Sequence, residues 1–348
     1  MTTLLLPCAG RSSRYPGVRP KWMLTTPEGR LAVEVAAASV PAGIVTRRVI
    51  AIRADHDAAF GGGSALRRAF GDDIEILVLD RETNGPAHTV ATMIEKAGVE
   101  GPILIKDADS FFVPAPIMKK NFVAVVDLRQ ALDMSRVGAK SFVTLNEHGL
   151  IAGITEKEVV SNYISCGLYG FADAAEFLRC FKTVRDLALG ETFVSHIISE
   201  GLGRGDAVWP HFVNDFVDVG TLDDWRAYTA TRRVYFCDID GVVFKNQSAF
   251  FPPFWGDDPE PITENIAHLK KLTSDGGQLI FVTSRSEAYR EATLRALDSV
   301  GLKAHALVMG CAHAARVMIN DFADSNPYPT ASAINIARNQ PDLARLLS

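Results

Sequence analysis

The sequence has few cysteines, no excess of basic charge and no long apolar run. Its five cysteines occur singly, without a C-x-x-C pair, and their odd number argues against a disulfide framework. A net charge of −5 gives the chain no general attraction for nucleic acid or for anionic membranes. These absences favour a protein with reduced cysteines whose ligands are small anions held in a local basic pocket.

A membrane span and a secretion signal are missing as well. No stretch reaches the roughly 18 apolar residues that a transmembrane helix needs, and the N-terminus shows no signal-peptide pattern. We therefore expect a cytoplasmic protein with neither a membrane nor a nucleic acid as partner. The sequence is compatible with a homo-oligomer but does not specify one.

What the sequence does contain is a series of short apolar runs separated by helix-length segments. The clearest are TTLLLP, RRVIAIRA, IEILVL, GPILIKD, KSFVTLN, RVYFCDID, GQLIFVTS, HALVMG and ARVMIND. Such runs are typical of mainly parallel strands buried under helices on both faces, which predicts an α/β fold. The pattern restarts near residues 228–233, so we predict two domains of this kind, residues 1–230 and 231–348.

The first apolar run leads directly into a basic loop. The loop residues are Gly10, Arg11, Ser12, Ser13 and Arg14, and Lys21 follows shortly after. Glycine lets backbone N–H groups approach a ligand, while guanidinium groups and a lysine complement the spread negative charge of a phosphate. The loop therefore predicts an anion-binding site, although a plain connection with solvated arginines would have the same composition. It matches neither the P-loop nor the dinucleotide-binding pattern.

The stretch LLLPCAGRSSRYPGVRPKWML, which contains this loop, resembles the signature loop of sugar-nucleotide pyrophosphorylases and related nucleotidyltransferases. In that family the loop and a lysine hold the triphosphate of an NTP. The resemblance implies a Rossmann-like nucleotidyltransferase domain in which Gly10 to Ser13 bind the nucleotide and Arg14 and Lys21 contribute to catalysis.

Further segments resemble the family in the same order along the chain. ETNGPAHTV resembles the segment that lines the nucleotide base, which implies that the backbone of Gly85 approaches the ring. GITEKEV resembles the acceptor side and implies that Lys157 neutralises the acceptor phosphate while Glu156 binds its hydroxyls. An exposed charge pair is the alternative interpretation of those two residues.

Carboxylates occur where this chemistry needs a metal. Asp107 and Asp109 follow an apolar strand, and in an extended segment both side chains would point the same way. Carboxylates at the carboxyl edge of a sheet suit Mg²⁺, which prefers oxygen ligands and keeps phosphate oxygens in its sphere. The resemblance implies that Asp109, or else Asp107, is one family metal ligand and that Asp218 in DFVDVGTLDDW is the second.

The implied reaction is transfer of a nucleotidyl group from an NTP to a phosphorylated small molecule, most simply a sugar 1-phosphate, with release of pyrophosphate. A phosphonate or a phospho-alcohol acceptor and the identity of the base stay open. A glycosyltransferase that uses Asp107-Ala108-Asp109 to bind a nucleotide sugar is the main alternative. The triphosphate-type loop with Lys21 argues against it.

The second half resembles the haloacid dehalogenase-like (HAD-like) phosphohydrolases with a minimal cap. RVYFCDIDGVVF supplies Asp238 and Asp240, LIFVTSRS supplies Thr283, and AARVMIND supplies Arg316 and Asp321. The resemblance implies that Asp238 is the nucleophile, Asp240 the acid and base, and Thr283 a phosphoryl ligand. It also implies Mg²⁺ bound by Asp238, Asp321 and the carbonyl of Asp240.

Two departures from that pattern stand out. Arg316 takes a position where lysine is commoner, so Lys303 is an alternative, and the terminal acidic pair is spaced Asp-x-x-Asp. They leave open a catalytically silent domain that serves binding or assembly. With both domains active, the chain is predicted to be a Mg²⁺-dependent bifunctional enzyme, and the fusion fits supply of an activated sugar for a surface polysaccharide.

Overall fold

The computed structural model describes residues 2–117, 120–130, 137–187, 190–246, 259–321 and 330–347. The chain divides into two compact units, Met1–Trp225 and Arg226–Ser348. The division falls within helix α7 (Leu222–Ala230), whereas the apolar pattern places a boundary after residue 230. Among the described residues no helix is both long and apolar enough to cross a membrane.

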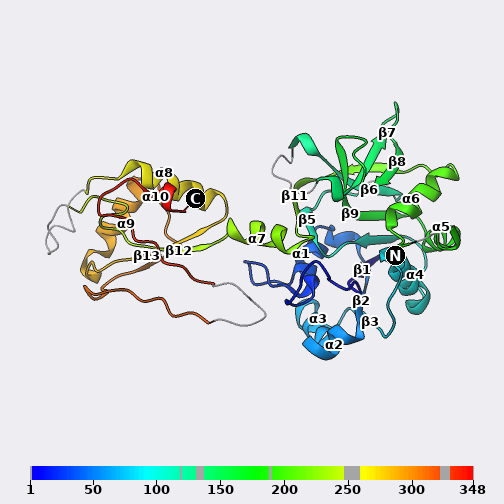
Figure 1. The fold of residues 1–348 in the computed structure, drawn as a ribbon, viewed down its shortest axis with the longest axis horizontal. Helices are drawn as coiled ribbons and strands as arrows, with labels where there is room; N and C mark the ends of the chain where they lie inside the picture. The colour runs from blue at the N-terminus through cyan, green and yellow to red at the C-terminus, as the bar shows by residue number, and fades with distance from the viewer. Residues whose placement is uncertain are drawn as a thin grey trace. The chain divides into compact units, whose positions relative to one another are not determined.

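Unit 1 is built on a nine-stranded mixed sheet (Figure 1). Its parallel section consists, in spatial order, of β3 (Glu75–Leu79), β2 (Arg47–Arg53), β1 (Thr3–Pro7) and β4 (Ile103–Lys106). The other strands are β6 (Phe122–Asp127), β7 (Ser141–Leu145), β8 (Ile151–Glu156), β9 (Tyr163–Phe171) and β10 (Trp209–Phe212). The α/β class and the parallel section are as predicted, but β9 runs antiparallel to both β4 and β6, which apolar runs alone do not reveal.

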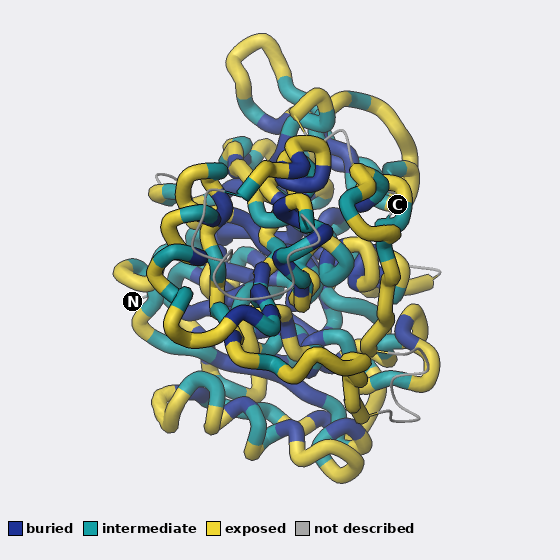
Figure 2. Tube along the Cα trace, turned by 90° about the vertical axis from the view of Figure 1, so that its left-hand side faces the viewer, coloured by how far each residue is buried: buried dark blue, intermediate teal, exposed yellow. Residues whose placement is uncertain are grey.

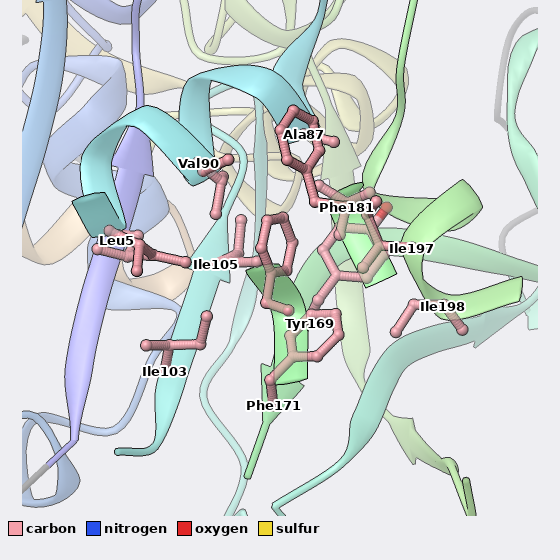
Figure 3. Packing of buried hydrophobic residues seen from close by; sticks show 14 of the residues in the cluster. Leu5, Ala87, Val90, Ile103, Ile105, Tyr169, Phe171, Phe181, Ile197 and Ile198 are labelled. Carbon is pink, nitrogen blue, oxygen red and sulfur yellow. The ribbon is translucent and has the colours of Figure 1, made fainter. Parts of the chain in front are cut away.

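Helices cover both faces of this sheet. One face packs against α4 (Pro86–Ala97), α5 (Ala174–Leu187) and α6 (Val194–Gly203), and the other against α1 (Ala32–Ala38) and α3 (Gly62–Phe70), with α2 (Ala54–Phe60) beside β2. Successive strand residues face opposite ways, so Leu5 joins the first core while Leu4 and Leu6 join the second. Figure 3 shows Leu5 and Ile105 of neighbouring strands near Val90 of α4. In Figure 2 the buried stretches of the chain are coloured dark blue.

The sheet brings two chain segments together at one edge. β1 and β4 are parallel neighbours, with Leu5 opposite Ile105, so the loops that follow Pro7 and Lys106 leave the sheet side by side. Beyond that edge, β5 (Ser110–Val113) pairs antiparallel with β11 (Asn214–Asp218) in a two-stranded ribbon. Through this ribbon, the segment near the end of unit 1 that contains Asp218 lies beside the segment that follows β4.

Unit 2 has a three-stranded parallel sheet in the order β12 (Val234–Cys237), β13 (Gln278–Val282), β14 (Ala306–Val308). The helices are α8 (Thr263–Ser274), α9 (Arg290–Ser299) and the short α10 (Leu343–Leu347). A core that includes Cys237, Leu279, Phe281, Ile266 and Leu297 joins α8 and α9 to one face of the sheet.

Two predictions for this unit are wrong within the described residues. Helices do not cover both faces: right-handed crossovers between strands that advance in one direction place α8 and α9 on the same side, and Val234 and Phe236 on the opposite face stay exposed. The predicted strand ending in Asp321 is not formed either. Val317 and Ile319 are 81% and 90% exposed. The alternate apolar residues of this segment are therefore not packed against a core, which is the contact that would stabilise a strand here.

The core of unit 1 yields a stability prediction. Phe177 is fully buried, and its ring lies 5.1 Å from that of Phe171 in an edge arrangement. We expect Phe177→Ala to lower the free energy of unfolding by about 3–5 kcal/mol, because truncation leaves a cavity. Phe60→Ala, at a ring that is 44% exposed, should cost less than about 1 kcal/mol. Urea denaturation followed by tryptophan fluorescence measures both, and equal losses would contradict the packing.

Candidate active site

The basic loop after β1 is open to solvent, and a buried side chain at its end attaches it to another segment of unit 1. The predicted binding residues Gly10, Arg11, Ser13 and Arg14 are exposed, as ligand access requires, and Ser12 is half-buried. Tyr15 is buried, and its hydroxyl donates a hydrogen bond to the carbonyl of Val219. Burial, with nearby carboxylates, raises the pKa of this phenol, which keeps it a donor. Tyr15 thus ties the loop to the segment that contains Asp218.

Arg11 and Ser12 have local partners. Arg11 forms an exposed ion pair with Glu82, at the start of the segment predicted to line a base. Ser12 has a positive φ of 53°, and its hydroxyl accepts a hydrogen bond from the Lys21 amide at 3.2 Å. The loop therefore contacts the residues that the sequence assigns to the same ligand.

Lys21 and Asp109 form an ion pair at the centre of the site. The Lys21 ammonium lies 2.5 Å from the Asp109 carboxylate. Burial opposes ionisation of Asp109, but the charge and hydrogen bond of Lys21, with Arg14 nearby, hold the pKa of that carboxyl well below its usual range. Burial likewise works against the charge on Lys21, and Asp109 outweighs it, so the pKa of Lys21 is raised. Both groups are therefore charged near neutral pH.

Asp218 forms a second ion pair, with Lys140. Both side chains are largely buried, with 13% and 18% of their surface exposed. Burial raises the pKa of Asp218, an effect that Lys140 partly offsets and Asp109 reinforces. Lys140 is the first residue of the apolar run KSFVTLN, but no functional motif includes it, and the sequence prediction missed it.

The two carboxylates converge on Gly220. A Cβ built on this glycine would lie 3.2 Å from Oδ1 of Asp218, 3.5 Å from Oδ2 of Asp109 and 3.7 Å from Nη1 of Arg14. The amide of Val219 also donates to the carbonyl of Asp109 at 2.9 Å. A side chain at this position would enter the space that these charged groups surround, and its Cβ would press on the Asp218 carboxylate.

This donor set fits Mg²⁺ shared with a nucleotide. Within the described ranges, no group of three or more His, Cys, Asp or Glu side chains could hold a metal ion alone. Mg²⁺ normally takes one or two protein carboxylates together with substrate phosphate oxygens and water. Asp109 and Asp218 supply two carboxylates beside an open basic loop, so the arrangement suits a metal that arrives with phosphates better than a resident one.

Asp107 has different surroundings from Asp109. The extended conformation expected between Asp107 and Asp109 is wrong, because residues 108 and 109 form a turn. Asp107 packs against Gly167, where a Cβ would come within 2.6 Å of its Oδ2. Burial, followed by repulsion from Asp109, raises the pKa of Asp107 to about 6. Of the two, Asp109 is the one that faces Lys21 and Gly220.

A buried lysine that the sequence prediction missed supports this turn. Lys106 is fully buried at the end of β4 and donates to the carbonyls of Asp107 and Ser110 at 2.8 and 2.9 Å and to the Ser110 hydroxyl at 2.7 Å. Burial lowers the pKa of Lys106 to about 8. A lysine inside the apolar run ILIKD, directly before two aspartates, was the signal that could have identified it.

Glu156 and Lys157 lie at and just after the end of β8. Glu156 accepts hydrogen bonds from the hydroxyls of Ser141, at 2.6 Å, and Ser195. Lys157 has a positive φ of 57°, and its ammonium lies 5.1 Å from the centre of the Phe193 ring. Protein groups thus hold both side chains, Glu156 through two serine hydroxyls and Lys157 through the Phe193 ring.

Gly85 is the N-cap residue that precedes α4, and its φ is +96°. A Cβ there would lie 2.5 Å from the carbonyl oxygen of Thr192. The close approach that requires glycine is therefore to the protein backbone, so Gly85 alone gives no evidence for a nucleotide base.

Unit 2 gathers four predicted residues around the end of β12. Asp238 pairs with Arg316 at 3.0 Å, while Asp240 is held bidentately by Arg285 at 2.7 and 2.9 Å. Thr283 is buried, and its hydroxyl accepts from the Arg285 amide at 3.1 Å. Arg285, which the sequence prediction missed, could have been identified from its place two residues after Thr283.

Two further predicted residues of this unit, Asp321 and Lys303, are exposed to solvent. Asp321 lies in a segment without regular structure. Arg316 is the cation that pairs with Asp238. Asp324, the second residue of the Asp-x-x-Asp pair, lies outside the described residues.

Comparisons with known proteins bear on the fold. No protein-family model matches the chain, and no curated protein matches it in sequence. A nucleoside-diphosphate-sugar pyrophosphorylase from Vibrio cholerae RC9 is similar in structure, with 22% identity, a TM-score of 0.55, and coverage of 65% of this chain and 98% of that one. An inositol-1-phosphate CTP transferase from T. maritima has 15% identity and a TM-score of 0.53, covering 66% and 93%. The chain therefore has a nucleotidyltransferase fold over 65–66% of its residues, a portion about as long as unit 1. Neither match covers the remainder of the chain.

The contact between Asp107 and Gly167 can be tested with a matched pair of glycines. Gly167→Ala should destabilise the protein by at least about 2 kcal/mol more than Gly149→Ala. Both glycines have φ near +70°, but a Cβ at Gly149 meets nothing within 4 Å, whereas one at Gly167 meets Asp107. The free energy of unfolding from urea titration measures the difference. Equal losses would show that the site tolerates the added methyl group.

Proposed function

We propose that unit 1 transfers a nucleotidyl group from an NTP to the phosphate of a small molecule and releases pyrophosphate. The observation that carries this proposal is the convergence of the Asp109 and Asp218 carboxylates and the Arg14 guanidinium around Gly220, with Lys21 in contact with Asp109. Two largely buried carboxylates close together repel each other, and a metal ion bound with an anionic ligand would relieve that repulsion. A nucleotide triphosphate with its metal ion is such a ligand.

The reaction needs no protein nucleophile. A phosphate oxygen of the acceptor forms a bond to the α-phosphorus of the NTP, the bond from that phosphorus to the bridging oxygen breaks, and pyrophosphate leaves with the electron pair. Arg14 and Lys21 would bind the triphosphate and stabilise the negative charge that develops on the leaving group. Mg²⁺, held by Asp109 and Asp218, would supply screening between the two anionic substrates.

The acceptor side is proposed to be the strand ends around Glu156 and Lys157. Glu156 presents a carboxylate that already accepts two hydroxyl groups, which is the contact that a sugar or another polyol would make. The names of the structural neighbours, a nucleoside-diphosphate-sugar pyrophosphorylase and an inositol-1-phosphate CTP transferase, support a phosphorylated polyol. A sugar 1-phosphate is the simplest acceptor of this class, and phosphonates belong in the same trial.

For unit 2 we propose a Mg²⁺-dependent phosphate monoester hydrolase. Two carboxylates at a parallel-strand end, each fixed by its own arginine, favour this second activity. Asp238 would attack the phosphorus and release the alcohol, and water would then hydrolyse the aspartyl phosphate, with Asp240 moving the protons. Arg316 would orient the nucleophile, and Asp321 is a proposed metal ligand. The two activities together would supply an activated sugar.

The first activity is tested by pyrophosphate release. Purified protein is incubated with Mg²⁺ and each NTP in turn, against sugar 1-phosphates, inositol 1-phosphate, phosphonates and phospho-alcohols. We expect release with a defined NTP and acceptor. Lys21→Ala should lower kcat/KM by about 10²–10³-fold because it removes charge stabilisation of the leaving group, and Asp218→Asn should lower it as much because it removes a proposed Mg²⁺ ligand. Lys182→Ala, at an exposed position on α5, should retain full activity.

A different result would change the assignment. Absence of pyrophosphate release from every pair, together with transfer of sugar from a nucleotide diphosphate sugar, would replace this proposal with a glycosyltransferase that binds its donor through Asp107-Ala108-Asp109.

The second activity is tested with p-nitrophenyl phosphate and the same sugar phosphates. Asp238→Asn should lower phosphate release by more than about 10³-fold, because the amide is a poor nucleophile. Asp275→Asn, at an exposed position after α8, should release phosphate normally. Nucleotidyl transfer by the Asp238→Asn protein should be unchanged and confirms that unit 1 is folded. Hydrolysis that survives Asp238→Asn would overturn the assignment of Asp238 as the nucleophile. No hydrolysis by the unsubstituted protein would overturn the phosphatase proposal in favour of a silent domain.

A further inference from the structure

Lys140 is placed between the two halves of the candidate site. Its ammonium contacts the Asp218 carboxylate, and its own carbonyl accepts a hydrogen bond from the Lys157 amide at 2.9 Å. The next residue, Ser141, donates to Glu156. Lys140 therefore joins an aspartate of the nucleotide side to the strand ends of the acceptor side.

The two carboxylates have corresponding counter-ions. Lys21 contacts Asp109 and Lys140 contacts Asp218, and the side chains of both lysines are largely buried. Lys157, the lysine that the sequence analysis places on the acceptor phosphate, is directed instead at the Phe193 ring. Among the described residues, Lys140 is thus the acceptor-side lysine that actually faces a carboxylate at Gly220.

We propose that Lys140 binds the acceptor's phosphate and serves as the counter-ion of Asp218 until a metal ion is present. This inference rests on the proposed function of unit 1. Lys140 contacts Oδ2 of Asp218, whereas Oδ1 is the oxygen directed at Gly220. A divalent cation coordinated by the same carboxylate would repel the Lys140 ammonium, because both carry positive charge. Lys140 would then leave Asp218 while staying anchored by β7, with its charge free for an anion. The phosphate of the acceptor is the anion that arrives at this side.

The first test measures metal binding without nucleotide. Mn²⁺ is titrated into the free protein and followed by electron paramagnetic resonance. Lys140→Met should bind Mn²⁺ about tenfold more tightly than the unsubstituted protein, because the competing charge is gone. Lys140→Arg, which keeps the charge, and Lys182→Met, on the exposed face of α5, should not change the affinity. Far-UV circular dichroism checks that each variant is folded.

The second test measures anion binding. With Mn²⁺ saturating, inorganic phosphate binding is followed by calorimetry, and Lys140→Met should weaken it about tenfold or more. In the transferase assay the same variant should raise KM for the acceptor and leave KM for the NTP nearly unchanged, whereas Lys21→Met should raise the latter. Lys140→Arg should restore most of the acceptor affinity.

The outcomes separate this inference from the proposed function. Tighter Mn²⁺ binding with unchanged phosphate binding would overturn the phosphate role, and no change in either would show that Lys140 is only structural. If no NTP and acceptor pair releases pyrophosphate but both binding shifts occur, the proposed function fails while Lys140 stands as the anion-binding lysine beside Asp218.

Discussion

The structure of unit 1 depends on keeping two buried carboxylates close together. Asp109 and Asp218 approach the same glycine, and without cations their repulsion in a partly dehydrated site would separate them. Lys21 and Lys140 each contact one of them, and the Arg14 guanidinium lies near both. Removing one partner of such a pair leaves an uncompensated charge, so the lysines are as necessary to the folded site as the aspartates.

The fold supplies these groups from distant parts of the chain. β1 and β4 are parallel neighbours, which places the basic loop beside the turn at Asp107 to Asp109. β11 then pairs with β5 in antiparallel register, with Asp218 opposite Ser110, and the Tyr15 hydroxyl fastens the loop to the same segment. The fully buried Lys106 supports the turn from behind through three hydrogen bonds. Each contact fixes a backbone position, so the charged side chains are held in place before a ligand binds.

The sequence predicts the parts of this site that lie in continuous motifs and misses those that depend on long-range pairing. The α/β class and the parallel strands of unit 1 follow from apolar runs, and the basic loop, Asp109 and Asp218 follow from strand ends and from resemblance. Lys140 lies 78 residues from Asp218 and Tyr15 lies 204 residues from Val219. All of these residues lie in or beside segments that the sequence marks, but no local pattern says which segment pairs with which. In unit 2 the run ARVMIND has the composition of a strand, but a strand also needs a paired edge, which composition does not guarantee.

The most direct measurement is the anomalous scattering of Mn²⁺ in crystals of the protein grown with Mn²⁺ and an NTP. If the two carboxylates are the metal site of a nucleotidyltransferase, the main peak in unit 1 lies within coordinating distance of both Asp109 and Asp218, with Lys21 and Lys140 no longer in contact with them. A peak bound by Asp107 instead, or no peak in unit 1 while both lysine–aspartate pairs persist, would contradict that assignment.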